Sequence, residues 1–156
     1  MKTINLLAAM SLIAVFASPA LASEQVPFKG SLAMVQTGEV QGGFLIVEGS
    51  GSGNATQLGR FAMTYHEQVD LSTGIDVATL SFVAANGDGL SASSIGHATP
   101  TPDPNILLLE EVATITGGTG RFASATGTFT LQRVLNLTTG VSSGLFTGTI
   151  SNPGRR

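Results

Sequence analysis

The feature that most constrains the fold is the alternation of apolar and polar side chains at every second position. Between Phe61 and Leu71 the odd-numbered positions are mostly apolar, whereas the even-numbered ones carry polar groups such as His66. The stretches 78–84 and 128–137 alternate in the same way. A period of two belongs to a β-strand with one buried face, and the helical period of 3.6 is hard to find along this chain. The pattern predicts a sheet rather than a helical bundle.

Five further runs complete a set of about eight short strands: 27–36, 42–48, 89–98, 106–116 and 144–151. Turn signals separate the strands. The Asn86-Gly87 dipeptide predicts a type I′ hairpin, the glycine-rich segment 49–54 predicts a flexible loop, and the three prolines of 99–104 exclude a central strand there. This spacing predicts an antiparallel sandwich or barrel. A closed barrel is favoured because only 11% of the residues are charged, which leaves few side chains to protect open sheet edges.

The first 22 residues have the features of a secretory signal peptide. Lys2 supplies a positive charge, an apolar run follows over 6–17, and the small residues Ala20 and Ala22 form a cleavage site. The alternative, a membrane anchor, would need about 20 consecutive apolar residues, more than this run offers. We therefore predict a signal peptide at 1–22 and a β-barrel domain at 23–156. The product would be secreted or periplasmic and free of the membrane after cleavage.

Composition excludes several classes of function. A formal net charge of −3 offers no basic surface for nucleic acid, so no nucleic-acid partner is predicted. The chain has no cysteine, which excludes a thiol nucleophile and a disulfide framework. Its two histidines, His66 and His97, are isolated and expected at the surface, and the acidic residues lack calcium-loop spacing. The sequence predicts neither a metal site nor an organic cofactor.

Charged side chains on apolar strand faces are the most informative anomaly. Alternation places Glu67, Glu111 and Arg133 on faces that are otherwise apolar, with Tyr65 beside Glu67. Two segments 66 residues apart resemble each other, Leu71–Gly74 and Leu137–Gly140. In that alignment Glu67 and Arg133 occupy equivalent positions with opposite charge. Because an isolated buried charge costs several kcal/mol, the three should pair.

We therefore predict a cluster of Arg133, Glu111, Glu67 and Tyr65 inside the barrel. One alternative is that a strand face is inverted by one residue, so that these side chains point outward. If they point inward, two interpretations of the cluster stay open. The cluster is either a structural ion pair that fixes the strand register, or the polar end of a ligand pocket. In the pocket, Arg133 would hold a carboxylate or enolate, and a glutamate would act as acid or base.

The segment Ala113–Thr130 resembles the signature of the allene oxide cyclase and dirigent barrels: a strand, Gly-Gly-Thr-Gly, an aromatic residue, small residues, a glycine and a second strand. The matching positions are Gly117, Gly118, Gly120, Phe122, Ala125 and Gly127. The segments 53–61 and 144–150 resemble secreted bacterial members of that superfamily. The resemblance implies an eight-stranded antiparallel barrel with a lumen, often assembled from identical subunits. Plant cyclases isomerise an allene oxide, dirigent proteins steer radical coupling and some bacterial relatives catalyse cycloadditions, but their acidic catalytic residues are not assigned to positions here.

Three classes of function follow from these observations. The favoured one is a secreted barrel that binds a small hydrophobic ligand in its lumen. The first alternative is a cyclase or isomerase acting on a small apolar substrate without metal or organic cofactor. The second is a non-catalytic structural protein with a fully packed interior. The sequence leaves open whether the protein is an enzyme.

Overall fold

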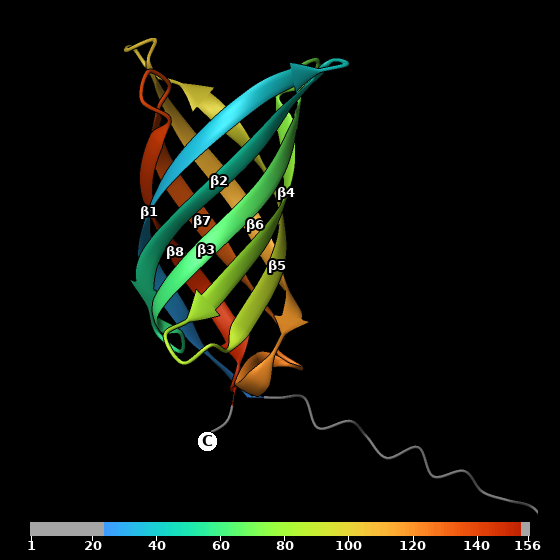
Figure 1. Ribbon diagram of the computed structural model, residues 1–156, viewed down its shortest axis with the longest axis vertical. Coiled ribbons are helices and arrows are strands. Elements are labelled where there is room, and N and C mark those ends of the chain that lie inside the picture. The colour runs from blue at the N-terminus through green and yellow to red at the C-terminus, as the bar shows by residue number, and fades with distance from the viewer. Residues whose placement is uncertain (1–23, 154–156) are drawn as a thin grey trace, which may run out of the picture.

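The computed structural model describes residues 24–153, so the predicted signal peptide at 1–22 lies outside the described residues. Eight strands and one short 3₁₀ helix, η1 (Gly120–Phe122), make up the fold (Figure 1). The strands are β1 (Gln25–Gln41), β2 (Phe44–Ala55), β3 (Gly59–Asp70), β4 (Ile75–Ala84), β5 (Gly89–Pro100), β6 (Ile106–Gly118), β7 (Gly127–Asn136) and β8 (Val141–Ser151). Within residues 24–153 there is no helix with the length and hydropathy of a membrane span.

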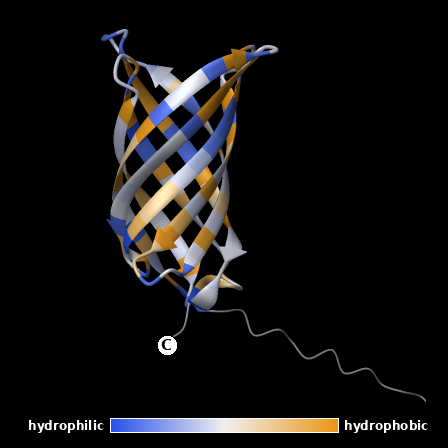
Figure 2. Ribbon diagram, in the orientation of Figure 1, coloured by the Kyte–Doolittle hydropathy of each residue, from blue (hydrophilic) through white to orange (hydrophobic). Residues whose placement is uncertain are grey.

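The strands form a closed antiparallel meander. Each strand pairs with the next along the chain, and β8 closes the sheet by pairing with β1 from Gln25–Ser151 through Val35–Val141 (Figure 1). Apolar and polar residues alternate along the strands, as Figure 2 shows. The closed eight-stranded barrel predicted from the alternation is confirmed. Closure removes sheet edges, which explains how so few charged residues suffice to protect the sheet.

The prediction of a loop at 49–54 is wrong, because these residues belong to β2 and pair with β1 and β3. Its glycines stand opposite large inward side chains of β3: Gly51 faces Met63 and Gly53 faces Phe61. A Cβ atom at Gly53 would lie 2.6 Å from Cζ of Phe61. The glycines of this strand therefore leave room for neighbouring side chains, a role that local sequence does not distinguish from flexibility.

Two turn predictions need refinement. A hairpin joins β4 and β5 at Asn86-Gly87 as expected, but Asn86 is not among the described residues with positive φ, whereas Gly87 has φ 87°. A type I′ turn requires positive φ at both central residues, so the turn is of another type. The exclusion of a strand from 99–104 is wrong for its first two residues, because β5 extends to Pro100. Pro100 pairs with Leu107 at the last position of β5, where a missing N–H is tolerated.

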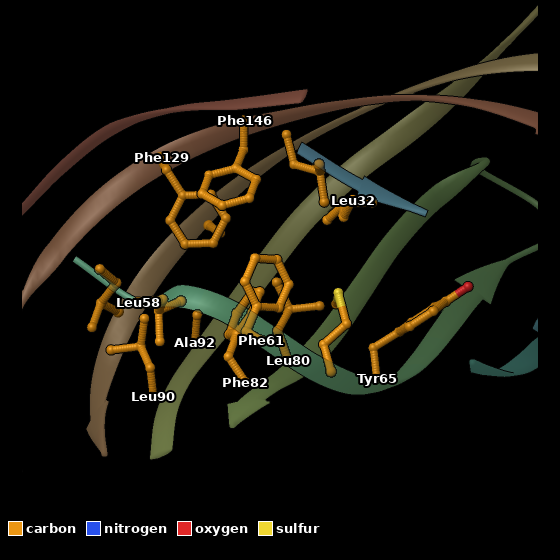
Figure 3. Close-up of a cluster of buried hydrophobic side chains, with 14 of the residues drawn as sticks. Leu32, Leu58, Phe61, Tyr65, Leu80, Phe82, Leu90, Ala92, Phe129 and Phe146 are labelled. Carbon is orange, nitrogen blue, oxygen red and sulfur yellow. The ribbon is translucent and has the colours of Figure 1, made fainter. Parts of the chain in front are cut away.

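Aromatic rings fill one half of the barrel. Four of the buried rings, Phe61, Phe82, Phe129 and Phe146, face one another across the lumen in Figure 3. The centroids of Phe61 and Phe82 are 5.4 Å apart, as are those of Phe129 and Phe146. Phe122 of η1 is fully buried and packs with this core cluster near the barrel end. The rings of Phe61 and Phe82 meet edge to face and those of Phe129 and Phe146 are tilted, arrangements that stabilise a packed aromatic core.

Candidate functional site

A layer of polar side chains crosses the barrel beyond the aromatic core. We call it the polar layer: Tyr65 and Glu67 of β3, Asp76 of β4, Glu111 of β6, Arg133 of β7 and Gln36 of β1. The five titratable members are only 2–5% exposed to solvent. Tyr65 lies at the edge of the aromatic cluster, and its hydroxyl points away from the rings (Figure 3). The structure thus brings together all four residues that the sequence placed in one cluster.

Arg133 and Glu111 form the strongest contact in the layer. Nε of Arg133 donates to Oε2 of Glu111 at 3.1 Å, and Nη2 donates to Oε1 at 2.5 Å. Two parallel charge-assisted hydrogen bonds make this a bidentate pair. Burial opposes the charge on Arg133, but attraction by Glu111 outweighs it, so the pKa of the guanidinium stays above its usual value. Arg133 is therefore permanently charged, and Glu111 is its main hydrogen-bond partner.

The rest of the guanidinium is also occupied. Nη1 donates to Oε1 of Gln36 at 3.4 Å, Nη2 lies 3.6 Å from Oε2 of Glu67, and Cζ lies 5.2 Å from the centre of the Tyr65 ring. Tyr65 donates its hydroxyl to the same oxygen of Gln36 at 2.5 Å. Burial raises the pKa of Tyr65 to about 12 despite the nearby Arg133, so the phenol is neutral. All three guanidinium nitrogens of Arg133 therefore have partners within the polar layer.

Asp76 and Gln36 are members of the site that the sequence argument missed. Asp76 pairs with Gly96 and stands two residues before the inward-facing Ala78, so its side chain continues the same face. Gln36 likewise follows Leu32 and Met34 on the inner face of β1. Extending the predicted stretch 78–84 by two positions would have found Asp76. Gln36 lies within the predicted strand 27–36, and it was passed over because the argument considered only ionisable side chains.

Unlike Glu111, the carboxyl groups of Glu67 and Asp76 form no bidentate pair with Arg133. Among residues 24–153, Oε2 of Glu67 and Oδ1 of Asp76 are buried without a hydrogen-bond partner. Burial raises the pKa of Glu67 to about 7, against the opposing attraction of Arg133. Burial also raises the pKa of Asp76 to about 6, and the charge of Glu111 adds to the effect. Both groups exchange protons near neutral pH and leave acceptor atoms unsatisfied.

Glycines opposite the polar side chains make room for the layer. Gly49 pairs with Tyr65, Gly144 pairs with Arg133, and Gly96 pairs with both Asp76 and Glu111. A Cβ atom at Gly144 would lie 2.8 Å from Cγ of Arg133, and one at Gly96 would lie 2.7 Å from Cγ of Glu111. The long polar side chains can therefore lie flat over the neighbouring strand, which a larger residue would prevent.

A cavity of about 230 Å³ occupies the barrel end opposite η1. Its walls are apolar, and Gln36, Glu67 and Asp76 are the polar side chains that line it. The apolar side chains around it are Leu45, Val47, Val69, Ala98, Leu107, Leu109, Leu135 and Leu137. The polar layer thus separates a ring-filled half of the barrel from a half that is hollow.

A larger hollow of about 540 Å³ lies over β5–β8 and is lined chiefly by outward-facing side chains, including Leu108, Val134 and Leu145. Two of its polar side chains pair with each other, because Nε2 of Gln132 donates to Oε2 of Glu110 at 2.8 Å. The lumenal cavity instead ends on unsatisfied carboxyl oxygens. We therefore place the candidate site in the lumen. His66 and His97 lie at the exposed surface, where the sequence predicted them.

Comparison of the chain with protein-family models, curated proteins and solved structures found no match. The likeness of the segment Ala113–Thr130 to allene oxide cyclase and dirigent barrels therefore stays a prediction. The class that fold and site define is a closed eight-stranded antiparallel barrel whose lumen is packed at one end and holds a carboxyl-floored cavity at the other.

Proposed function

We propose that this protein binds a small, mostly apolar molecule in the lumenal cavity, with the molecule's polar group resting on the polar layer. The supporting observation is the contrast between the two halves of one barrel. Phenylalanine rings fill the end near η1, whereas leucines and valines at the other end surround about 230 Å³ of space. Concave apolar walls with a few convergent polar groups are the usual form of a ligand site.

The size of the cavity limits the ligand. A volume of about 230 Å³ matches roughly eight water molecules at the density of the liquid, taking about 30 Å³ for each. It is below the roughly 300–1,000 Å³ of pockets for drug-sized ligands. The expected ligand is therefore a short chain or a single substituted ring. Such a molecule would suit a binding protein that acts outside the cytoplasm, as the predicted signal peptide at 1–22 implies.

The polar layer also restricts the ligand's polar group. Arg133 is engaged by Glu111, Gln36 and Glu67, so a ligand carboxylate would have to displace one of these partners. The unsatisfied atoms at the cavity floor are acceptors, Oε2 of Glu67 and Oδ1 of Asp76. A ligand group that donates hydrogen bonds complements them, because a buried acceptor left unpaired costs about 1–3 kcal/mol.

Binding can be tested with cyclohexylmethanol, a single ring with a donating hydroxyl, by isothermal titration calorimetry. Leu109→Trp would fill the cavity from its wall and is expected to abolish binding. Leu108→Trp is the matched control, because Leu108 is the preceding residue of the same strand and is 48% exposed on the outer face. Failure of the wild-type protein to bind, or equal binding by both variants, would contradict the proposal.

A second candidate function is isomerisation of a small apolar substrate. The observation that favours it is a buried carboxyl group, Glu67, with a pKa of about 7 at the floor of an apolar cavity. A general acid–base group works best with a pKa near the operating pH. Glu67 would take a proton from one carbon of the substrate and return it to another, with no net gain or loss of electrons.

The second function predicts that the wild-type protein accelerates deuterium incorporation from D₂O into a small enolisable ketone such as cyclohexanone, followed by NMR. Glu67→Gln should remove the acceleration, whereas the surface variant Glu110→Gln should keep it. Equal rates for wild type and Glu67→Gln would contradict an acid–base role.

A further inference from the structure

We propose that the occupant of the lumenal cavity is a small apolar primary amine, held as its ammonium ion by Glu67, Asp76 and Glu111. This inference rests on the proposed binding function and names the class of ligand. It starts from the imbalance of charge in the polar layer, where three carboxyl groups share one guanidinium. Glu111 takes the bidentate contact with Arg133 and Glu67 reaches the same guanidinium only at 3.6 Å, so one positive charge is left to balance three carboxyl groups.

The geometry of the three carboxyl groups fits an ammonium ion. One oxygen from each of Glu67, Asp76 and Glu111 lies within 4.8 Å of the other two. A nitrogen at the centre of three points so spaced is at most about 2.8 Å from each, which is the length of a charge-assisted N–H···O bond. An alkylammonium group has three N–H donors and no acceptor, so its hydrogen-bonding capacity matches the three oxygens.

Two buried atoms independently indicate that a donor is missing from this place. Within the described part of the chain, Oε2 of Glu67 and Oδ1 of Asp76 have no hydrogen-bond partner, although their residues are 5% and 3% exposed. Both residues line the cavity, whose walls are leucine, valine and alanine side chains. An amine with a hydrocarbon body would place its nitrogen on the carboxyl groups and its body against these walls.

A divalent cation fits the site less well. Calcium takes 6–8 oxygen ligands and magnesium near-ideal octahedral geometry, whereas the cavity walls above the carboxyl groups supply hydrocarbon. The Arg133 guanidinium lies 2.5 Å from Glu111 and 3.6 Å from Glu67, and it repels a doubly charged metal ion about twice as strongly as a singly charged ammonium ion. An ammonium ion needs no further ligands, and its hydrocarbon body occupies the space that a metal would leave unfilled.

Protons compete with the amine for the same oxygens. The charged and titratable groups that face Glu67 and Asp76 are Arg133 from β7, Glu111 from β6, and Tyr65 from β3, with His97 of β5 acting on Asp76. Among the described residues, β1 contributes the uncharged Gln36 and β2 contributes Val47 to this region. Because burial raises the pKa of Glu67 to about 7, the ammonium ion must displace a proton at lower pH. Amine affinity should therefore rise at least about tenfold between pH 6 and pH 8.

The test compares three probes with one ring and different polar groups: cyclohexylmethylamine, cyclohexylmethanol and cyclohexanecarboxylate. Their affinities for the full chain are measured by calorimetry at pH 6, 7 and 8. We expect the amine to bind at least tenfold more tightly than the alcohol at pH 8, and the carboxylate to bind most weakly. Glu67→Gln and Asp76→Asn should each reduce amine affinity by tenfold or more while they keep alcohol binding. The outer-surface variant Glu110→Gln should behave as wild type.

The outcomes separate the two proposals. If the alcohol or the carboxylate binds as tightly as the amine at pH 8, the amine assignment is wrong while the binding function stands. If none of the three probes binds, both proposals are wrong. Displacement of the bound amine by micromolar Mn²⁺ would overturn the amine assignment in favour of a metal site.

Discussion

Glu67 should make the protein most stable in mildly acidic solution. The pKa of its carboxyl group is about 7 in the fold and has an ordinary value of 4.5, because burial disfavours the charged form. The folded state therefore binds a proton more tightly than the unfolded state does. A tenfold difference in proton affinity corresponds to about 1.4 kcal/mol, so this one group accounts for roughly 3 kcal/mol of pH-dependent stability.

The sign follows from which state holds the proton. The contribution of Glu67 is fully present below pH 4.5, decreases as the pH rises through 7, and is lost above about pH 8. Asp76 acts in the same direction between its ordinary pKa of 3.8 and about 6. The free energy of unfolding should consequently fall as the pH is raised from 4.5 to 8.

Urea unfolding at several pH values measures this dependence. The chain has one tyrosine and no tryptophan, so intrinsic fluorescence reports directly on Tyr65 in the polar layer. Glu67→Gln mimics the protonated side chain, and its stability should vary by up to about 3 kcal/mol less over this range than that of wild type. Glu110→Gln, on the outer face, should follow the wild-type profile. A wild-type stability that increases from pH 4.5 to 7, or identical profiles for wild type and Glu67→Gln, would refute the reasoning.

Three further substitutions test the structure by urea unfolding. Arg133→Met should destabilise the barrel by about 3–5 kcal/mol because it leaves the buried Glu111 carboxylate without a partner. The double variant with Glu111→Leu should recover most of that loss. Equal losses for the single and the double variant would contradict a bidentate pair. Gly144→Ala should cost about 1–3 kcal/mol, since its Cβ would lie 2.1 Å from the backbone carbonyl oxygen of Gln132. Gly38→Ala, whose nearest neighbour is the flexible tip of Leu45 at 3.0 Å, should cost less. Phe122→Ala should cost about 3–5 kcal/mol yet leave amine affinity unchanged, because Phe122 packs at the other end of the lumen; lost binding would show that the two ends are coupled.

The fold was largely predictable because its cause is local. Side chains that alternate over ten or more residues specify a strand with one buried face whatever its partners are. The same rule located Glu67, Glu111 and Arg133, since a charge at an inward position must find a partner. What the rule did not supply was the length of each strand, so Asp76 at the start of β4 was overlooked.

The remaining errors concern contacts between distant segments. Gly51 and Gly53 suggested a loop because glycine is flexible, but their role depends on the β3 side chains that face them across the sheet. The division of the lumen is equally non-local. Phenylalanines from six separate segments meet at one end, and leucines and valines from several strands leave space at the other. No single stretch of sequence records which side chains meet across a closed barrel.

Methyl NMR of the full chain titrated with cyclohexylmethylamine would show where a ligand binds. The account predicts that the methyl signals of Val47, Leu109 and Leu135 shift together, because these side chains surround the cavity above Glu67 and Asp76. Shifts confined to Leu108, Val134 and Leu145 would place the ligand in the outer hollow instead and contradict a lumenal site.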